Sequence, residues 1–188
     1  MSASVRSGSA QSHAVAEFLT SASSGPSALV IEGQAGIGKT TLWLSAVDEA
    51  RERGFRVLSE RAVAAESVLA YESLADLLDE VDPTTWAQVP SVQRLAVDRM
   101  VRADADGPAA DQRSLAAGFV AVVEVLAKET SVLIALDDLQ WLDPSSANVV
   151  AYTARRLKGR VGMLATVRTE AGAESPVDWL QMPRPEQM

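Results

Sequence analysis

The stretch ALVIEGQAGIGKTT, residues 28–41, decides the fold. Its first five residues read as a buried strand, its middle is rich in glycine, and a helical pattern follows from residue 42 to residue 53. A strand, the spacing G-x-x-x-x-G-K-[ST] and a helix, in that order, predict a phosphate-binding loop, or P-loop. Gly33, Gly36 and Gly38 allow backbone conformations that other residues avoid, so the loop can turn its N–H groups toward a phosphate.

The other residues of the loop have predicted roles of their own. Lys39 would supply a mobile charge for the β and γ phosphates, and Thr40 a hydroxyl for Mg²⁺. The following helix adds the positive end of its dipole. The competing interpretation, a glycine-rich turn with a surface lysine, is disfavoured by the flanking strand and helix. The predicted binding residues are Gly33, Gln34, Ala35, Gly36, Ile37, Gly38, Lys39, Thr40 and Thr41.

Composition narrows the function classes. With 188 residues and 47% hydrophobic residues, the chain can form one domain with a sizeable core. It contains no cysteine, which excludes disulfides and thiolate metal sites and fits a reducing cytoplasm. The net charge of −8 disfavours nucleic-acid binding by this chain. No apolar run approaches the ~20 residues of a membrane helix, so we expect a cytoplasmic protein without a membrane partner.

Strand and helix patterns alternate along the chain. Further strands are predicted at residues 55–62, 132–136 and 161–167. The predicted helices cover residues 71–81 and 91–102, a segment that Ser114 caps, and a segment from Pro144, capped by Asp143, to the basic residues before Gly159. This alternation predicts an α/β fold, the three-layer P-loop NTPase sandwich with a mainly parallel sheet, truncated after the fourth strand.

We expect this domain to occupy residues 26–170. Residues 1–25, rich in serine and alanine, are predicted to form a flexible leader with one short helix at residues 14–19. Residues 103–112 read as a polar loop, and residues 171–188, interrupted by three prolines, as an irregular tail.

Two further motifs follow predicted strands. Four apolar residues and then Asp137-Asp138 form the Walker B pattern, in which Asp137 would hold Mg²⁺ and Asp138 would orient or deprotonate a water. Arg168 follows the fourth strand and could sense a γ-phosphate if that strand lies between the other two. The alternatives, an acidic turn and a solvated arginine, remain open for each motif alone. Because the carboxyl ends of parallel strands meet on one side of a sheet, all three motifs are expected there.

Two tryptophans lie close to these motifs. Trp43, on the helix after the loop, is predicted to be a core residue. Trp141, which follows Gln140, is predicted to fill the junction between helix and sheet rather than to stack on a base. Trp179 falls in the predicted tail.

The runs EGQAGIGKTT, residues 32–41, and LDDLQWLDPS, residues 136–145, together resemble the ATPase domain of the large LuxR-type bacterial transcription regulators. That family belongs to the NACHT/AAA-like signal-transducing ATPases with numerous domains (STAND). The likeness spans residues 27–170. It implies ATP and Mg²⁺ as cofactors, with Lys39, Thr40 and Asp137 in the roles given above, Asp138 as the catalytic acid and Arg168 as the γ-phosphate sensor. It also implies a switch in which ATP favours a self-associating form and slow hydrolysis resets it.

The chain departs from that family in two places. Family members begin with a Gly-Arg-x-x-Glu stretch near adenine, whereas residues 8–12 read GSAQS. The fifth strand, the lid, the winged-helix module, the sensing repeats and the DNA-binding helix-turn-helix of the family are also missing, so we expect a module without a DNA-binding part. Two other functions stay open: a small-molecule phosphotransferase, which would need an arginine-bearing lid and an acceptor pocket, and a binding-only remnant without turnover.

Overall fold

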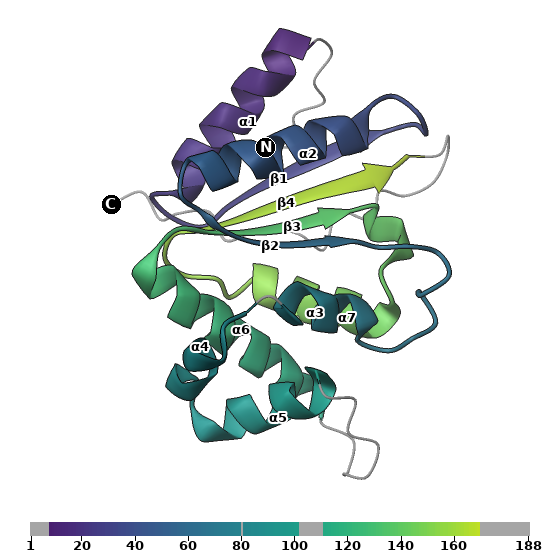
Figure 1. The fold of residues 1–188 in the computed structure, drawn as a ribbon. Coiled ribbons are helices and arrows are strands. Elements are labelled where there is room, and N and C mark those ends of the chain that lie inside the picture. Colours follow the sequence, from purple (N-terminus) through teal and green to yellow (C-terminus); the bar gives the residue numbers. More distant parts are fainter. Residues whose placement is uncertain (1–7, 80, 102–110, 170–188) are drawn as a thin grey trace.

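The computed structural model describes residues 8–79, 81–101 and 111–169 (Figure 1). Four parallel strands form one sheet in the order β1–β4–β3–β2. The fourth strand therefore lies between the first and the third, as the sensing role of its end requires. The strands are β1 (Ser27–Gly33), β2 (Arg56–Arg61), β3 (Val132–Asp137) and β4 (Val161–Arg168).

Helices cover both faces of the sheet, which confirms the predicted three-layer α/β architecture (Figure 1). Every residue of β3 is buried, as expected for a strand that is covered on both faces. Within the described residues, no helix combines the length and the apolar character needed to cross a membrane. One face carries α1 (Gly8–Ala22) and α2 (Lys39–Glu52), and the other carries α3 (Glu72–Asp79), α4 (Pro83–Gln88), α5 (Ser91–Val101), α6 (Gln112–Glu129) and α7 (Pro144–Ala154).

The core is divided by the sheet into two clusters. Leu133 and Ala135 of β3 pack among the buried residues of α1 and α2. Ile134 and Leu136, the alternate residues of the same strand, pack among those of α3, α6 and α7. This period-two alternation is what a strand between two helical layers requires.

The predicted short helix at residues 14–19 is confirmed, but α1 extends over Gly8–Ala22, so the prediction of a flexible leader is wrong for the residues on either side of it. Val15, Phe18, Leu19 and Ala22 follow the i, i+3, i+4, i+7 spacing and are at most 6% exposed. Gly162 of β4 makes room for this helix, because a Cβ there would lie 2.9 Å from the Cβ of Ala22. The apolar stripe is short and surrounded by serine and alanine, which hid the full length of the helix in the composition.

The helix starts were predicted with mixed success. Pro144 begins α7, and the Asp143 carboxylate accepts the Ser146 N–H at 2.9 Å, which confirms that cap. The cap of α6 is Asp111 rather than Ser114, since the Asp111 carboxylate accepts the backbone N–H of Ser114 at 3.2 Å. Asp82 not only follows α3 but also caps α4, which the sequence patterns missed.

The two tryptophans near the predicted site differ. Trp43 is 3% exposed and confirms the prediction of a core residue. Trp141 lies at the surface, 37% exposed, so the prediction that it fills the junction between helix and sheet is wrong. The smaller Leu139 and Leu142 on either side of it are buried instead and occupy that position. Trp179 and residues 103–110 of the loop predicted at residues 103–112 lie outside the described residues, whereas Asp111 and Gln112 belong to the start of α6.

Candidate functional site

The loop between β1 and α2 has its shape set by glycine. Gly36 and Gly38 have φ values of 78° and 92°, in the region where other residues are strained. Gly38 is the N-cap of α2 and provides no side-chain hydrogen bond to the first turn of that helix. A helix start without a side-chain cap leaves backbone N–H groups for an anion, at the positive end of the helix dipole.

Lys39 is the first residue of α2, and its side chain turns back over the loop. Its Nζ donates to the backbone oxygen of Gln34 at 2.9 Å, and the residue is only 8% exposed. Thr40 follows it and is half-buried. The ammonium group is therefore held against the loop rather than in solvent, which suits a charge that must meet a bound phosphate.

Asp137, the last residue of β3, is a buried carboxylate whose two oxygens both have partners. Oδ1 accepts a hydrogen bond from Thr166 Oγ1 at 2.5 Å, and Oδ2 lies 3.4 Å from Nε of Arg61 on β2. Asp137 is 1% exposed and Thr166 of β4 is fully buried. Burial of a carboxylate is costly unless its oxygens are hydrogen-bonded, so Thr166 and Arg61 make this position tolerable.

Asp138 turns the chain away from the sheet, and its conformation is fixed from two sides. Its φ of 55° and ψ of 53° are left-handed, which ends β3. Its backbone N–H donates to Thr166 Oγ1 at 2.8 Å, and its Oδ1 accepts from Nε2 of Gln140 at 2.9 Å. The same Gln140 side chain accepts the backbone N–H of Arg168 through Oε1 at 3.0 Å.

The sheet register brings most of the predicted site residues to one side of the molecule. Gly33 pairs with Arg168, and the Thr166 hydroxyl bonds to Asp137 across β3 and β4. The ends of β1, β4 and β3 are therefore direct neighbours, and the guanidinium-bearing Arg168 is exposed there. Lys39 is tied to the same loop that leaves β1.

The patterns in the sequence missed three residues of this group. Thr166, Arg61 and Gln140 connect the acidic pair to its neighbours. Thr166 carried a signal as a hydroxyl residue inside an otherwise apolar strand, and Gln140 stands in the run that resembles the LuxR-type regulators. The contacts themselves, from Gln140 to Arg168 of β4 and from Arg61 of β2 to Asp137 of β3, join segments distant in the sequence, which periodicity does not report.

A small cavity of about 60 Å³, open to solvent, lies between α1, β1 and the start of α2. Its wall includes Gln11 and Val15 of α1, Ile37 of the loop and Leu42 of α2, and it reaches Lys39. The cavity is thus continuous with the loop and partly apolar. Its α1 wall exists because residues 8–22 are helical.

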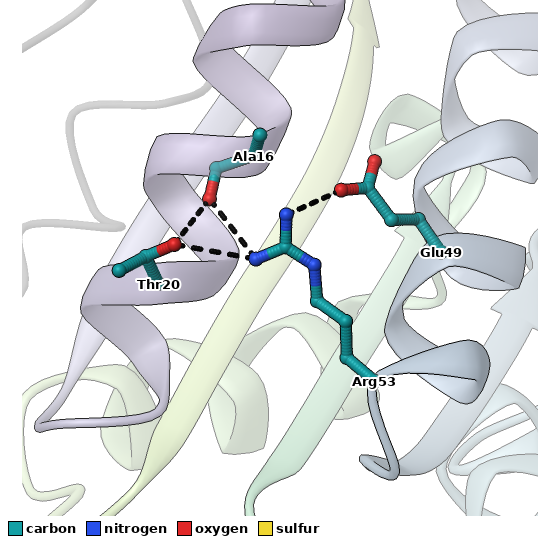
Figure 2. Close-up of polar contacts among 4 residues, drawn as sticks. All are labelled: Ala16, Thr20, Glu49 and Arg53. Atoms are coloured by element: carbon teal, nitrogen blue, oxygen red, sulfur yellow. Dashed lines mark hydrogen bonds and ion pairs between the residues drawn. The ribbon is translucent and has the colours of Figure 1, made fainter.

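Arg53, which follows α2, holds α1 in place (Figure 2). Its Nη1 donates to the Ala16 oxygen at 3.3 Å and to Thr20 Oγ1 at 3.2 Å, and its Nη2 pairs with Glu49 at 2.5 Å. One side chain therefore connects the outer helix to α2, the helix that begins at the loop.

A separate group of carboxylates lies beside β2. Oxygens of Glu60, Glu66 and Asp76 all lie within 4.8 Å of one another. Burial, together with the nearby Asp76 carboxylate, raises the pKa of Glu60 to about 7. The surroundings of Glu60 therefore disfavour its negative charge.

A glycine-rich loop with the P-loop sequence after β1 and an acidic pair at the end of β3, with β4 between these two strands, are typical of α/β P-loop ATPase domains. The sequence matches the AAA ATPase domain family over residues 9–165, and the chain belongs to that family.

Among solved structures, the chain is similar to one described as "Structure of the Aeropyrum Pernix ORC2 protein (ADPNP-ADP complexes)". The two chains are 20% identical with a TM-score of 0.48, and the similarity covers 89% of this chain and 42% of that chain. No curated protein matches the sequence.

Proposed function

We propose that this chain is an ATP-binding switch module with slow, Mg²⁺-dependent ATP hydrolysis, of the kind that LuxR-type regulators of the STAND class contain. The observation that carries the proposal is the register of the sheet, which makes the end of β1 with its glycine loop a neighbour of β4, and β4 a neighbour of the acidic end of β3. The AAA ATPase family membership supports nucleotide use.

The proposed phosphate site consists of the loop amides and Lys39. Backbone N–H groups of residues 33–41 would surround the β and γ phosphates, and the Lys39 ammonium would exchange its bond to Gln34 for a phosphate oxygen. The charged phosphate is the stronger acceptor, so this exchange is favourable.

The oxygen atoms available beside the loop fit Mg²⁺. Thr40 offers a hydroxyl and Asp137 a carboxylate, both hard donors of the type this ion prefers. The nearest cation to Asp137 Oδ2 is Arg61, whose side chain is 61% exposed and free to move outward. When bound, Mg²⁺ would neutralise charge on the phosphates. Asp137 would hold the ion, with its other oxygen anchored by Thr166.

Asp138 and Arg168 would act on the γ-phosphate end. Water would attack the γ-phosphorus while the bond to the bridging oxygen breaks, and Asp138 would accept the proton of that water. Arg168, exposed beside Gly33 at the end of β4, would contact the γ-phosphate oxygens and so report whether they are present.

The cavity beside α1 is the proposed place for the adenine base. Val15, Ile37 and Leu42 give it apolar walls, and the Gln11 amide supplies polar atoms at its wall. Residues 8–12 lack the arginine and glutamate of the LuxR-type pattern, so α1 would replace that contact mainly by apolar packing.

The proposed role as a switch, and the proposal that the module belongs to a transcription regulator, rest on the resemblance of residues 136–145 to the LuxR-type regulators. A switch of that kind implies self-association in the ATP form. The net charge of −8 argues against direct contact of this chain with nucleic acid. We also propose a cytoplasmic location, because a sequence without cysteine fits a reducing compartment.

The decisive binding experiment is calorimetric titration of Mg-ATP into the wild type and Lys39→Ala. Loss of one bond between charged groups should weaken binding roughly 10- to 100-fold. Lys158→Ala is the matched control, because this exposed lysine precedes β4 at the opposite end of the sheet. Binding that is unmeasurable in the wild type, or equal in both variants, would refute the proposal.

Turnover separates the three candidate functions. Slow phosphate release that Asp138→Ala abolishes, with Mg-ATP binding retained, is expected for the switch. ADP formation that a small acceptor stimulates, with that acceptor phosphorylated, would indicate the phosphotransferase. Binding without any phosphate release, unaffected by Asp138→Ala, would indicate the binding-only remnant.

A further inference from the structure

Gln140 bridges two groups to which the proposed function gives different tasks. Its Nε2 donates to Asp138 Oδ1 at 2.9 Å, and its Oε1 accepts the backbone N–H of Arg168 at 3.0 Å. The residue is half-buried in the short helix η1 (Leu139–Trp141) that follows β3. One planar amide therefore contacts both the acid after β3 and the end of β4.

The turn at Asp138 explains why this position needs a side chain. β3 ends at Asp137, so the Arg168 N–H has no strand residue to bond with on that side, and the Gln140 oxygen replaces it. On the other side, the next residue, Thr169, donates its N–H to the Gly33 oxygen at 3.2 Å. A series of hydrogen bonds thus runs from the first residue of the P-loop, through the end of β4, to the Asp138 carboxylate.

We propose that Gln140 is a positioning residue that couples the end of β4 to Asp138. When Arg168 moves to contact the γ-phosphate, the Asp138 carboxylate would move with it. The proposal rests on the function proposed above, in which Arg168 contacts that phosphate and Asp138 accepts the proton. An amide has its donor and acceptor a fixed distance apart. Movement of one partner therefore moves the other or breaks a bond.

The simpler alternative is that Gln140 only completes the sheet at Arg168. Two variants distinguish these roles. Gln140→Glu keeps an acceptor for the Arg168 N–H but places a second carboxylate against Asp138. Gln140→Met keeps the length of the side chain and removes both bonds. Gln88→Met, at the exposed end of α4, is the matched control.

The first measurement is the rate of ATP hydrolysis, together with the dissociation constant of Mg-ATP. Both Gln140 variants should lose roughly tenfold or more in kcat, because misplacement of the proton-accepting carboxylate by a fraction of an ångström is costly. Binding should stay within about twofold of the wild type, since the loop is untouched. If Gln140 only completes the sheet, Gln140→Glu keeps the acceptor for the Arg168 N–H and should retain the wild-type kcat.

The second measurement needs no turnover: amide hydrogen exchange at Arg168 in the free protein. Asp138→Ala removes one anchor of the Gln140 amide, so the Arg168 N–H should exchange several-fold faster than in the wild type. The double variant Asp138→Ala with Gln140→Met should exchange at nearly the same rate as Gln140→Met alone, because both changes break the same bridge. Unchanged exchange at Arg168 in Asp138→Ala, or a wild-type kcat in Gln140→Glu, overturns the coupling. If the wild type binds no Mg-ATP, the proposed function fails, while the exchange result still decides whether the bridge exists.

Discussion

The two halves of the proposed site are built in opposite ways. The loop of residues 33–38 is largely exposed, its shape depends on left-handed glycines, and the bond from the Lys39 side chain to the Gln34 oxygen crosses it. The ends of β3 and β4 are mostly buried, and hydrogen bonds of Thr166 and Gln140 join them. We therefore expect the loop to change conformation when it binds a ligand, whereas hydrogen bonds already fix the positions of Asp137 and Asp138.

The largest expected effect comes from removing the hydroxyl that holds the acidic pair. Thr166→Val keeps the shape of the side chain but leaves Asp137 Oδ1 and the Asp138 N–H without their partner. Unsatisfied buried groups of this kind, one of them charged, cost about 3 kcal/mol of unfolding free energy. Urea denaturation measures the loss.

Thr153→Val on α7 is the matched control for that change. Thr153 is equally buried, but its hydroxyl donates to the Val149 oxygen, which the helix already uses. No backbone group is left unpaired, so the loss should stay below about 1 kcal/mol. Equal losses in the two variants would show that burial alone, and not the bracing of β3 and β4, determines the stability of this half.

The loop half should respond to a change in the backbone rather than to a lost side chain. Gly38→Ala places a Cβ on a residue with φ of 92°, which costs about 1–2 kcal/mol and deforms the N-cap of α2. We expect Mg-ATP affinity to fall more than stability does, the reverse of Thr166→Val. Calorimetric titration and urea denaturation give the two values.

Gly25→Ala provides the comparison for Gly38. A Cβ at Gly25 would meet nothing within 4 Å, and Gly25 is not among the glycines with positive φ. Neither stability nor affinity should change beyond about 0.5 kcal/mol. If Gly38→Ala is as harmless, the left-handed N-cap is not what shapes the loop.

The same contrast explains which parts of the site the sequence could predict. The loop is encoded within nine consecutive residues, and the alternation of strands and helices placed it at the end of β1 as expected. The bracing of the acidic pair joins Asp137 to Thr166, 29 positions away, and Arg168 to Gln140, 28 positions away. Such contacts depend on which strands are neighbours in the sheet. The sequence patterns suggested where the strands lie but could not predict which side chains meet between them.

The course of α1 shows a second limit of the same kind. Its buried residues follow helical spacing, but the composition of residues 1–25 resembles that of a flexible segment. What makes the helix stable is the surface it meets, which includes residues of α2 and, from the far end of the chain, Leu164 and Gly162 of β4. Because part of this surface is distant in the sequence, local composition could not reveal the full length of the helix.

Glu60, a carboxylate with other carboxylates beside it, sharpens the comparison with Asp137, whose neighbours are a hydroxyl and a guanidinium. The pKa of Glu60, raised by burial and by Asp76 to about 7, lies above its ordinary value of 4.5. A raised pKa in the folded protein means that Glu60 contributes stability below pH 4.5, and that this is lost as pH rises through 7. After allowance for solvent screening, ionisation should cost about 1 kcal/mol at pH 8.

Glu60→Gln should therefore raise the unfolding free energy more at pH 8 than at pH 5. Urea denaturation at both values measures the difference between the variant and the wild type. Glu52→Gln, at the exposed end of α2, should show no such dependence on pH. A gain at pH 5 as large as that at pH 8 would show that the charge of Glu60 is not what the fold opposes.

The smallest effect concerns the wall that α1 gives to the loop half. Arg53→Ala removes the contacts to Ala16, Thr20 and Glu49 (Figure 2), and because the Arg53 side chain is 34% exposed, the loss should be only about 0.5–1 kcal/mol. Arg51→Ala is the control, since Arg51 pairs with Asp48 on its own helix. Amide exchange in α1 should quicken in Arg53→Ala and not in Arg51→Ala. If Mg-ATP affinity then falls as well, α1 is part of the binding site. If exchange in α1 quickens while affinity stays unchanged, the adenine base does not bind against α1. In that case the loop alone accounts for nucleotide affinity.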